Sequence, residues 1–136
     1  MRGLANEDAQ KNVPLGKTDY QAGDFSGDTK TTLDLEDDAA FCNWGGAWRM
    51  PTKGEFDTFF SGASYSGGDL SYKGVTFPAA GFGHYTELYE SPCIYWSSSL
   101  YTDSSSDAYG LIFNYGYVDT DYCSRCSGYS VRPLSE

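Results

Sequence analysis

The sequence predicts one α+β domain, in which two short helices precede a series of short antiparallel strands separated by long loops. Helical spacing of apolar residues is confined to the stretch between about residue 32 and residue 60. From residue 62 onward, Gly, Ser, Tyr and Asp separate short apolar segments, a pattern typical of strands and turns. We expect residues 1–31 to be a polar N-terminal segment of the same domain and residues 32–136 to form its body.

The first helix is predicted over the segment TLDLEDDAAFCNW, with Gly45-Gly46 ending it. An approximate helical stripe is formed by its apolar residues: Leu33, Leu35, Ala39, Ala40 and Phe41. Acidic residues crowd its first half, where the helix dipole favours negative charge: Asp34, Glu36, Asp37 and Asp38. We interpret these carboxylates as helix caps and a solvated face rather than as a catalytic pair.

A second helix is predicted from a capping box in which Thr52 is the N-cap and Glu55 bonds back to it. Phe56, Phe59 and Phe60 would form its buried face.

The strands are predicted from short apolar segments at residues 74–78, 94–96, 109–114 and 129–134. In the third of these, Tyr109, Leu111 and Phe113 alternate with the residues between them. Such alternation predicts a strand with one face in the core and the other presented outward.

The formal net charge of −10 argues against sequence-independent nucleic-acid binding and against anionic membranes, because both need Lys and Arg. We expect no membrane insertion, since no apolar stretch approaches spanning length, and the first residues lack the apolar core of a signal peptide.

The sequence motifs for a metal site or a redox site are weak, and we expect no metal and no cofactor. Cys123 and Cys126 have the spacing of a half-site, but a zinc site would need His84 or the two distant cysteines, Cys42 and Cys93. We therefore favour unpaired or incidental cysteines, although four cysteines permit three pairings. Asp19, Asp24 and Asp28 lie in a Gly-containing stretch without EF-hand spacing, which favours a solvated loop over calcium binding.

Several motifs occur together in a fixed order. The segment NWGGAWRMPT (43–52) followed by Glu55 resembles the WGGxWRMPTxxE signature of the Fibrobacter succinogenes major paralogous domain family. Later segments resemble that family's later motifs: FPAAG (77–81), YWSSS (95–99), Ala108-Tyr109 with Leu111 and Phe113, and GYSVRP (128–133). The resemblance covers about residues 32–134. It implies a C-type-lectin-like fold, in the branch shared with formylglycine-generating enzymes, of a kind found in surface and phage proteins of gut Bacteroidales.

Some members of that family are diversified by retroelements that substitute adenines at random in Asn-rich codons. Scrambled Asn codons cannot encode Lys, Glu, Gln, Trp or Met. None of these five types occurs in residues 97–127, whereas seventeen such residues occur in residues 1–96. The window 97–127 is therefore interpreted as a variable surface, which also gives an origin for Cys123 and Cys126 that needs no metal.

The resemblance implies a binding surface built from outward residues of this window. Its candidate ligand-binding residues are Tyr101, Asp103, Ser105, Ser106, Asp107, Gly110, Ile112, Tyr115, Tyr117, Asp119, Asp121, Tyr122, Cys123, Ser124, Arg125, Cys126 and Ser127. Nine of the twelve tyrosines lie between residues 85 and 129, and Tyr with Ser and Gly is the composition of antibody paratopes. We expect Tyr115, Tyr117 and Tyr122 to be the anchors. We expect Tyr95, Tyr109 and the three tryptophans, by contrast, to pack in the core.

The function predicted is receptor recognition, with a protein or glycan on a cell surface as the partner and a virion or bacterial surface as the location. The first alternative is a carbohydrate-binding lectin or adhesin of fixed specificity. An enzyme of the formylglycine-generating type is the second alternative and is disfavoured, because His84, the single histidine, has no catalytic motif around it.

Overall fold

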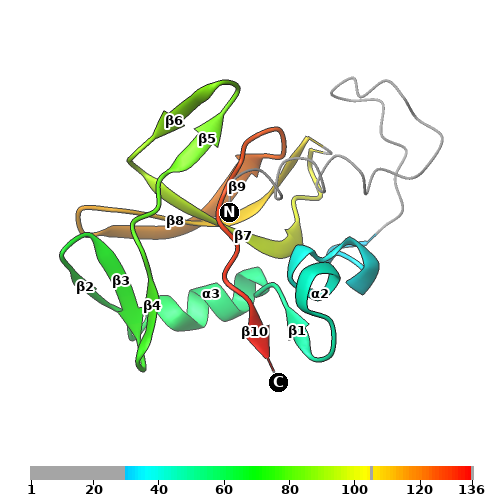
Figure 1. Cartoon of the computed structure of the whole chain (residues 1–136), viewed down its shortest axis with the longest axis horizontal. Helices are drawn as coiled ribbons and strands as arrows, with labels where there is room; N and C mark the ends of the chain where they lie inside the picture. Colours follow the sequence, from blue (N-terminus) through cyan, green and yellow to red (C-terminus); the bar gives the residue numbers. More distant parts are fainter. Residues whose placement is uncertain (1–29, 105, 136) are drawn as a thin grey trace.

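The computed structural model describes residues 30–104 and 106–135. The helical elements are η1 (Leu35–Asp37, a 3-10 turn), α2 (Ala39–Trp44) and α3 (Lys53–Phe60). The strands are β1 (Trp48–Arg49), β2 (Ser64–Ser66), β3 (Asp69–Tyr72), β4 (Val75–Phe77), β5 (Phe82–His84), β6 (Glu87–Tyr89), β7 (Cys93–Leu100), β8 (Asp107–Asn114), β9 (Tyr117–Ser124) and β10 (Leu134–Ser135). This order, with two helices followed almost entirely by short antiparallel strands, confirms the predicted α+β class (Figure 1).

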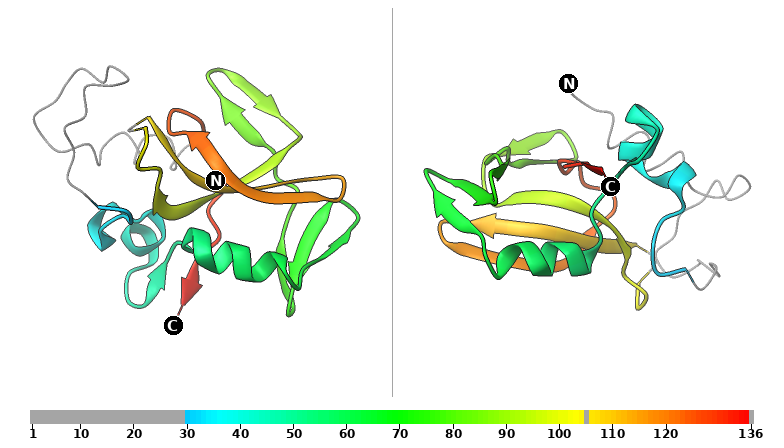
Figure 2. Two further views of the ribbon diagram at one scale, coloured as in Figure 1. Left: turned by 180° about the vertical axis from the view of Figure 1, so that it is seen from behind. Right: turned by 90° about the horizontal axis from the view of Figure 1, so that it is seen from below.

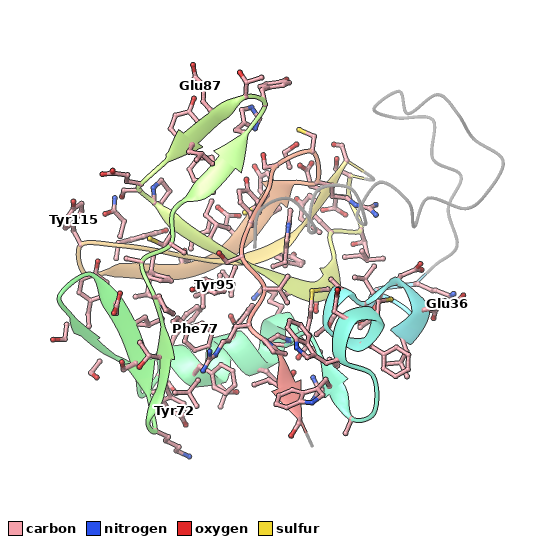
Figure 3. All side chains as sticks on the ribbon, viewed as in Figure 1. Glu36, Tyr72, Phe77, Glu87, Tyr95 and Tyr115 are labelled. Atoms are coloured by element: carbon pink, nitrogen blue, oxygen red, sulfur yellow. The ribbon has the colours of Figure 1, made fainter. Side chains whose placement is uncertain are left out.

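The centre of the fold is the antiparallel sheet β7–β8–β9, with β8 in the middle. One face of the sheet packs against α3, which crosses below it in Figure 1, and against the meander β2–β3–β4. Phe56 of α3 and Phe77 of β4 meet Leu111 of β8 there, and all three are almost fully buried. Phe77 and Tyr95, labelled in Figure 3, lie with their ring centroids 5.4 Å apart and nearly perpendicular. Tyr95 is therefore a core residue, as predicted.

The opposite face of the sheet is also covered, by α2, Met50 and the chain around Tyr129. Trp96 packs there against Tyr129, with ring centroids 4.5 Å apart. The prediction that this face is presented outward is wrong, because Gly110 is buried and Ile112 packs against the core. Alternation in a sequence separates the two faces of a strand but does not indicate whether the second face is covered.

The first helix is shorter than predicted because Asp38 interrupts it. Asp38 has an extended backbone, and its Oδ1 accepts hydrogen bonds from the amides of Ala40 and Phe41, at 2.8 and 3.1 Å. Its Oδ2 accepts a third bond from the amide of Met50, at 2.8 Å. Asp38 is thus the predicted cap, but it is buried rather than solvated. The helix ends at Gly45 as expected, with a positive φ of 65°.

The predicted capping box at the start of α3 is present. The amide of Thr52 donates to Glu55 Oε2 at 2.8 Å, and the amide of Glu55 donates to Thr52 Oγ1 at 3.2 Å. Arg49 donates to both carboxylate oxygens of Glu55, at 2.8 and 2.7 Å. These donors, Arg49 foremost, lower the pKa of Glu55 to about 2. The motif therefore fixes the direction in which α3 leaves β1.

The remaining strands form small pairs around the central sheet (Figure 2). β1 pairs with β10, and β5 pairs with β6 in a hairpin that projects beyond the sheet at the top of Figure 1. The segment 74–78 contains β4 as predicted, but the segment 129–134 reaches strand geometry only at Leu134, apart from a single parallel bridge between Ser130 and Tyr95.

The tryptophans divide into two environments. Trp96 is buried, as expected. Trp44 and Trp48 are 56% and 40% exposed, so the prediction that they pack in the core is wrong. They lie on either side of the Gly45-Gly46 turn, where a Cβ added at either glycine would meet no atom within 4 Å.

Candidate ligand-binding surface

The hairpin β8–β9 carries the predicted anchors on a defined backbone. Its two-residue turn consists of Tyr115 and Gly116, both with positive φ, at 41° and 92°. Positive φ at both central residues is the type I′ geometry, whose twist matches that of paired strands. The amide of Tyr115 donates to the hydroxyl of Tyr65 in β2 at 2.6 Å, and the Tyr115 ring, 86% exposed, lies at the outer end of the hairpin (Figure 3).

β9 is the edge strand of the central sheet within the described part of the chain. Because Asn114 and Tyr117 flank the two-residue turn as partners, the amides of Thr120 and Tyr122 point away from β8. These two amides donate instead to the side chains of the preceding residues, Asp119 Oδ1 and Asp121 Oδ1, each at 2.8 Å. The aspartates thus satisfy edge donors that would otherwise be open to pairing with another strand.

The exposed residues of β9 point to two different sides of the sheet. Tyr117, Asp119 and Asp121 lie on the side of α2, and the Tyr117 hydroxyl donates to Asp119 Oδ2 at 2.9 Å. This bond, followed by the charge of Asp119, raises the pKa of Tyr117. Thr120 and Tyr122 lie on the side of α3. The surface is therefore a ridge with two flanks, not one flat face.

On the α3 side, Tyr101, Tyr109 and Tyr122 form a tyrosine cluster. Tyr101 stacks on Tyr122 with ring centroids 4.7 Å apart, and it meets Tyr109 edge-on at 5.5 Å. Tyr109 is half-buried rather than part of the closed core that was predicted. Partial burial, followed by the charge of Asp103, raises the pKa of Tyr101.

Lys53, at the start of α3, adds a cation to this cluster. Its Nζ lies 5.5 Å from the centroid of the Tyr109 ring and 2.8 Å from Asp57 Oδ2. Asp57 Oδ1 accepts a hydrogen bond from Thr120 Oγ1 at 2.5 Å, which joins α3 to β9. The bond between Lys53 and Asp57 raises the pKa of the lysine and lowers that of the carboxyl.

The segment 124–128, which contains the end of the window and Gly128 after it, is bonded to neighbouring segments. The amide of Arg125 donates to the carbonyl of Ser106 at 2.9 Å, and Ser127 Oγ lies 2.8 Å from His84 Nδ1. Gly128 and Gly83 exchange two backbone hydrogen bonds, at 2.7 and 2.8 Å. The charge of Arg125 acts on Asp37 of η1, where it opposes the rise in pKa that burial causes.

Three of the predicted contact residues are wrong as surface residues, because Gly110, Cys123 and Ser127 are buried. Ile112 is only partly accessible and packs against the core. Ser105 lies outside the described residues, as do Asp19, Asp24 and Asp28. Exposed positions among the predicted set are Asp103, Tyr115, Tyr117, Asp119, Asp121, Tyr122 and Cys126. Partly exposed ones are Tyr101, Ser106, Asp107, Ser124 and Arg125.

Some residues near this surface were missed by sequence reasoning. Lys53 and Asp57 reach it only through the packing of α3 on the sheet, which no local pattern indicates. Tyr85 and Leu88, in the β5–β6 hairpin, are 84% and 80% exposed beside the residue 124–128 segment.

The cysteines of the window differ in chemistry. Burial first of all raises the pKa of Cys123 to about 12, so its thiol stays protonated at neutral pH. A thiol in that state is a poor nucleophile and a poor metal ligand. Cys126 is exposed, and its Sγ lies 3.1 Å from Ser124 Oγ. Among residues 30–104 and 106–135, no group of three His, Cys, Asp or Glu side chains is arranged to hold a metal ion.

Comparison with known proteins adds no relative, because no family model, curated protein or solved structure matches the chain. None of the helices in the described part of the chain has the length and apolar character needed to cross a membrane. The geometry itself defines a mixed α+β domain that presents tyrosines on both flanks of an edge strand and aspartates on one of them.

Proposed function

We propose that the chain is a ligand-binding domain with a C-type-lectin-like fold, and that β9 with Tyr101 contacts the ligand. The observation that carries the proposal is the exposure of Tyr115, Tyr117 and Tyr122 on one hairpin of a sheet packed on both faces. Tyrosine offers a large rigid contact area and a hydroxyl at low entropic cost. The order of two helices before short antiparallel strands accords with the fold that the family resemblance implies.

The placement of these rings favours a macromolecular ligand. Tyr117 and Tyr122 lie on opposite sides of β9 and are each more than half exposed. A ligand that contacts both must wrap around the edge of the sheet, which a small molecule cannot do. A protein or a long glycan on a cell surface has the necessary reach.

We further propose that the exposed positions of the window are diversified. Exposed side chains tolerate substitution with little change in stability, whereas the buried positions do not. The absence of Lys, Glu, Gln, Trp and Met from residues 97–127 supports the proposal. The test is to sequence the flanks of the gene. A near-identical repeat that differs from codons 97–127 only at adenines, beside a reverse transcriptase gene, is expected. A flank without such a repeat would leave a domain of fixed specificity.

The binding surface itself is tested with printed arrays of glycans and of cell-surface proteins. The variant Tyr117→Ser/Tyr122→Ser should lose the signal of the wild-type domain while keeping its melting temperature. Tyr85→Ser is the control, because Tyr85 is more exposed than Tyr117 and Tyr122 but lies on the β5–β6 hairpin. Full binding by the double variant, or equal loss in the control, would contradict the assignment to β9.

A further inference from the structure

Two tyrosines of this surface, Tyr117 and Tyr101, have a carboxylate beside the hydroxyl, and Tyr122 stacks on Tyr101. The Tyr117 hydroxyl donates to Asp119, and Asp121 bonds the amide of Tyr122. Tyr101 bonds to Asp103. The rings of Tyr117 and Tyr101 therefore lie beside a negative charge, and the Tyr122 ring, on the flank opposite Asp121, stacks on Tyr101 and extends the same aromatic surface. An electron-rich ring beside a carboxylate attracts cations.

The chain already holds one cation in this way. Lys53 places its Nζ 5.5 Å from the centroid of the Tyr109 ring while bonding to the Asp57 carboxylate at 2.8 Å. This pair of contacts, one to a ring and one to a carboxylate, lies in the same tyrosine cluster as Tyr122 and Tyr101. The contacts of Lys53 are thus an example, within the molecule, of how a basic side chain binds at this surface.

The charge balance of the surface points the same way. The window 97–127 contains four aspartates and one basic residue, Arg125, whose charge acts toward Asp37 of η1. The exposed edge of β9 is thus acidic, within a chain whose formal net charge is −10. An acidic partner or an anionic glycan would meet repulsion there, whereas a basic one would be attracted.

From these observations we propose that the partner is a protein segment rich in Arg and Lys, whose basic side chains lie over the rings of Tyr101, Tyr117 and Tyr122 beside the aspartates. This inference rests on the proposed function and names the chemical class of its ligand. A neutral or anionic glycan is the outcome that it excludes.

The test uses a short peptide of alternating Arg and Gly, with the same peptide carrying citrulline in place of Arg as the uncharged control. Binding to the full chain is followed by NMR amide shifts at low salt and at about 0.5 M salt, where screening is strong. The Arg peptide is expected to shift the amides of β9 and Tyr101, to weaken with salt, and to bind more tightly than its citrulline counterpart. Absence of binding, or equal binding of both peptides, would overturn the inference.

Two variants of equal net charge separate local recognition from general attraction. Asp119→Asn/Asp121→Asn removes two charges but keeps the acceptor oxygens that bond the edge amides, so we expect the peptide to bind about five- to tenfold more weakly. Glu36→Gln/Glu90→Gln removes two exposed charges elsewhere and should change binding less than about twofold. Equal effects of the two variants would overturn the proposal.

Failure of the proposed function would look different. If the array ligand proves neutral or acidic but is still lost in Tyr117→Ser/Tyr122→Ser, the surface is correct and the partner class is wrong. If that double variant still binds the ligand found on the printed arrays, the assignment of the surface to β9 fails.

Discussion

Gly110→Ala tests whether position 110 belongs to the packed sheet rather than to the ligand surface. A Cβ added there would lie 3.2 Å from Ile94 Cγ2, 3.2 Å from the carbonyl oxygen of Tyr95 and 3.3 Å from Cys123 Sγ. The Tyr95 carbonyl belongs to β7, which the pairing with β8 holds in place. The sheet must therefore distort to admit the methyl group, and we expect the free energy of unfolding to fall by about 1–2 kcal/mol.

Urea unfolding followed by circular dichroism measures this change. Gly54→Ala is the matched control, because position 54 lies in α3 with no atom within 4 Å of an added Cβ. Alanine should stabilise that helix by about 0.5 kcal/mol, so the two substitutions have opposite signs. In a double-mutant cycle with Cys123→Ala, removal of the Sγ contact should give a coupling of at least about 0.5 kcal/mol. A Gly110→Ala variant as stable as the wild type would refute the packing described for this face.

Three further predictions concern the capping box, the sheet edge and the buried thiol. The pKa of Glu55 is lowered from 4.5 to about 2 by Arg49. The ionised Glu55 therefore adds about 1–2 kcal/mol to the free energy of unfolding above pH 4.5, and this contribution is lost as the pH falls toward 2. In Glu55→Gln, the free energy of unfolding measured in urea should change less with pH over that range. A pH dependence equal to that of the wild type would contradict the ion pair. Asp119→Ala/Asp121→Ala uncovers the edge amides and should produce concentration-dependent dimers in sedimentation. The variant Asp119→Asn/Asp121→Asn keeps the acceptor oxygens and should not dimerise. Dimers from both variants would rule out the bonds to the edge amides as the cause. Cys123 should react with a thiol reagent only as fast as the protein unfolds, so rapid labelling in the folded state would show that it is accessible.

Local signals in the sequence were sufficient for some elements. The capping box at Thr52 and Glu55 was predicted because both partners lie within one turn and the motif needs no tertiary contact. Gly45 was predicted to end the first helix because a positive φ there favours glycine. The start of that helix was misplaced because Asp38 is fixed by a bond from Met50, a residue far along the chain.

The candidate surface was only partly predictable for the same physical reason. Exposure of Tyr117 and Tyr122 was expected from the family resemblance, but the strand β9 that carries both residues was not predicted. In a strand, residues five apart lie on opposite faces, whereas the ladder register decides which ring lies on the side of α3. Burial of Cys123 depends on α2 and the chain around Tyr129 covering a face that the strand pattern leaves undefined. Lys53 joins the surface only when α3 packs under the sheet, so no motif near it in sequence indicates that role.

The central claim is that β9 and Tyr101 form the ligand contact, and the most direct measurement is the footprint of an array-identified ligand on the backbone amides of the full chain. We predict that the shifted or protected amides form one continuous patch over β9, the Tyr115 turn and Tyr101, with the meander β2–β4 and η1 unaffected. A footprint confined to the β5–β6 hairpin, to α2 or to the meander would contradict the account.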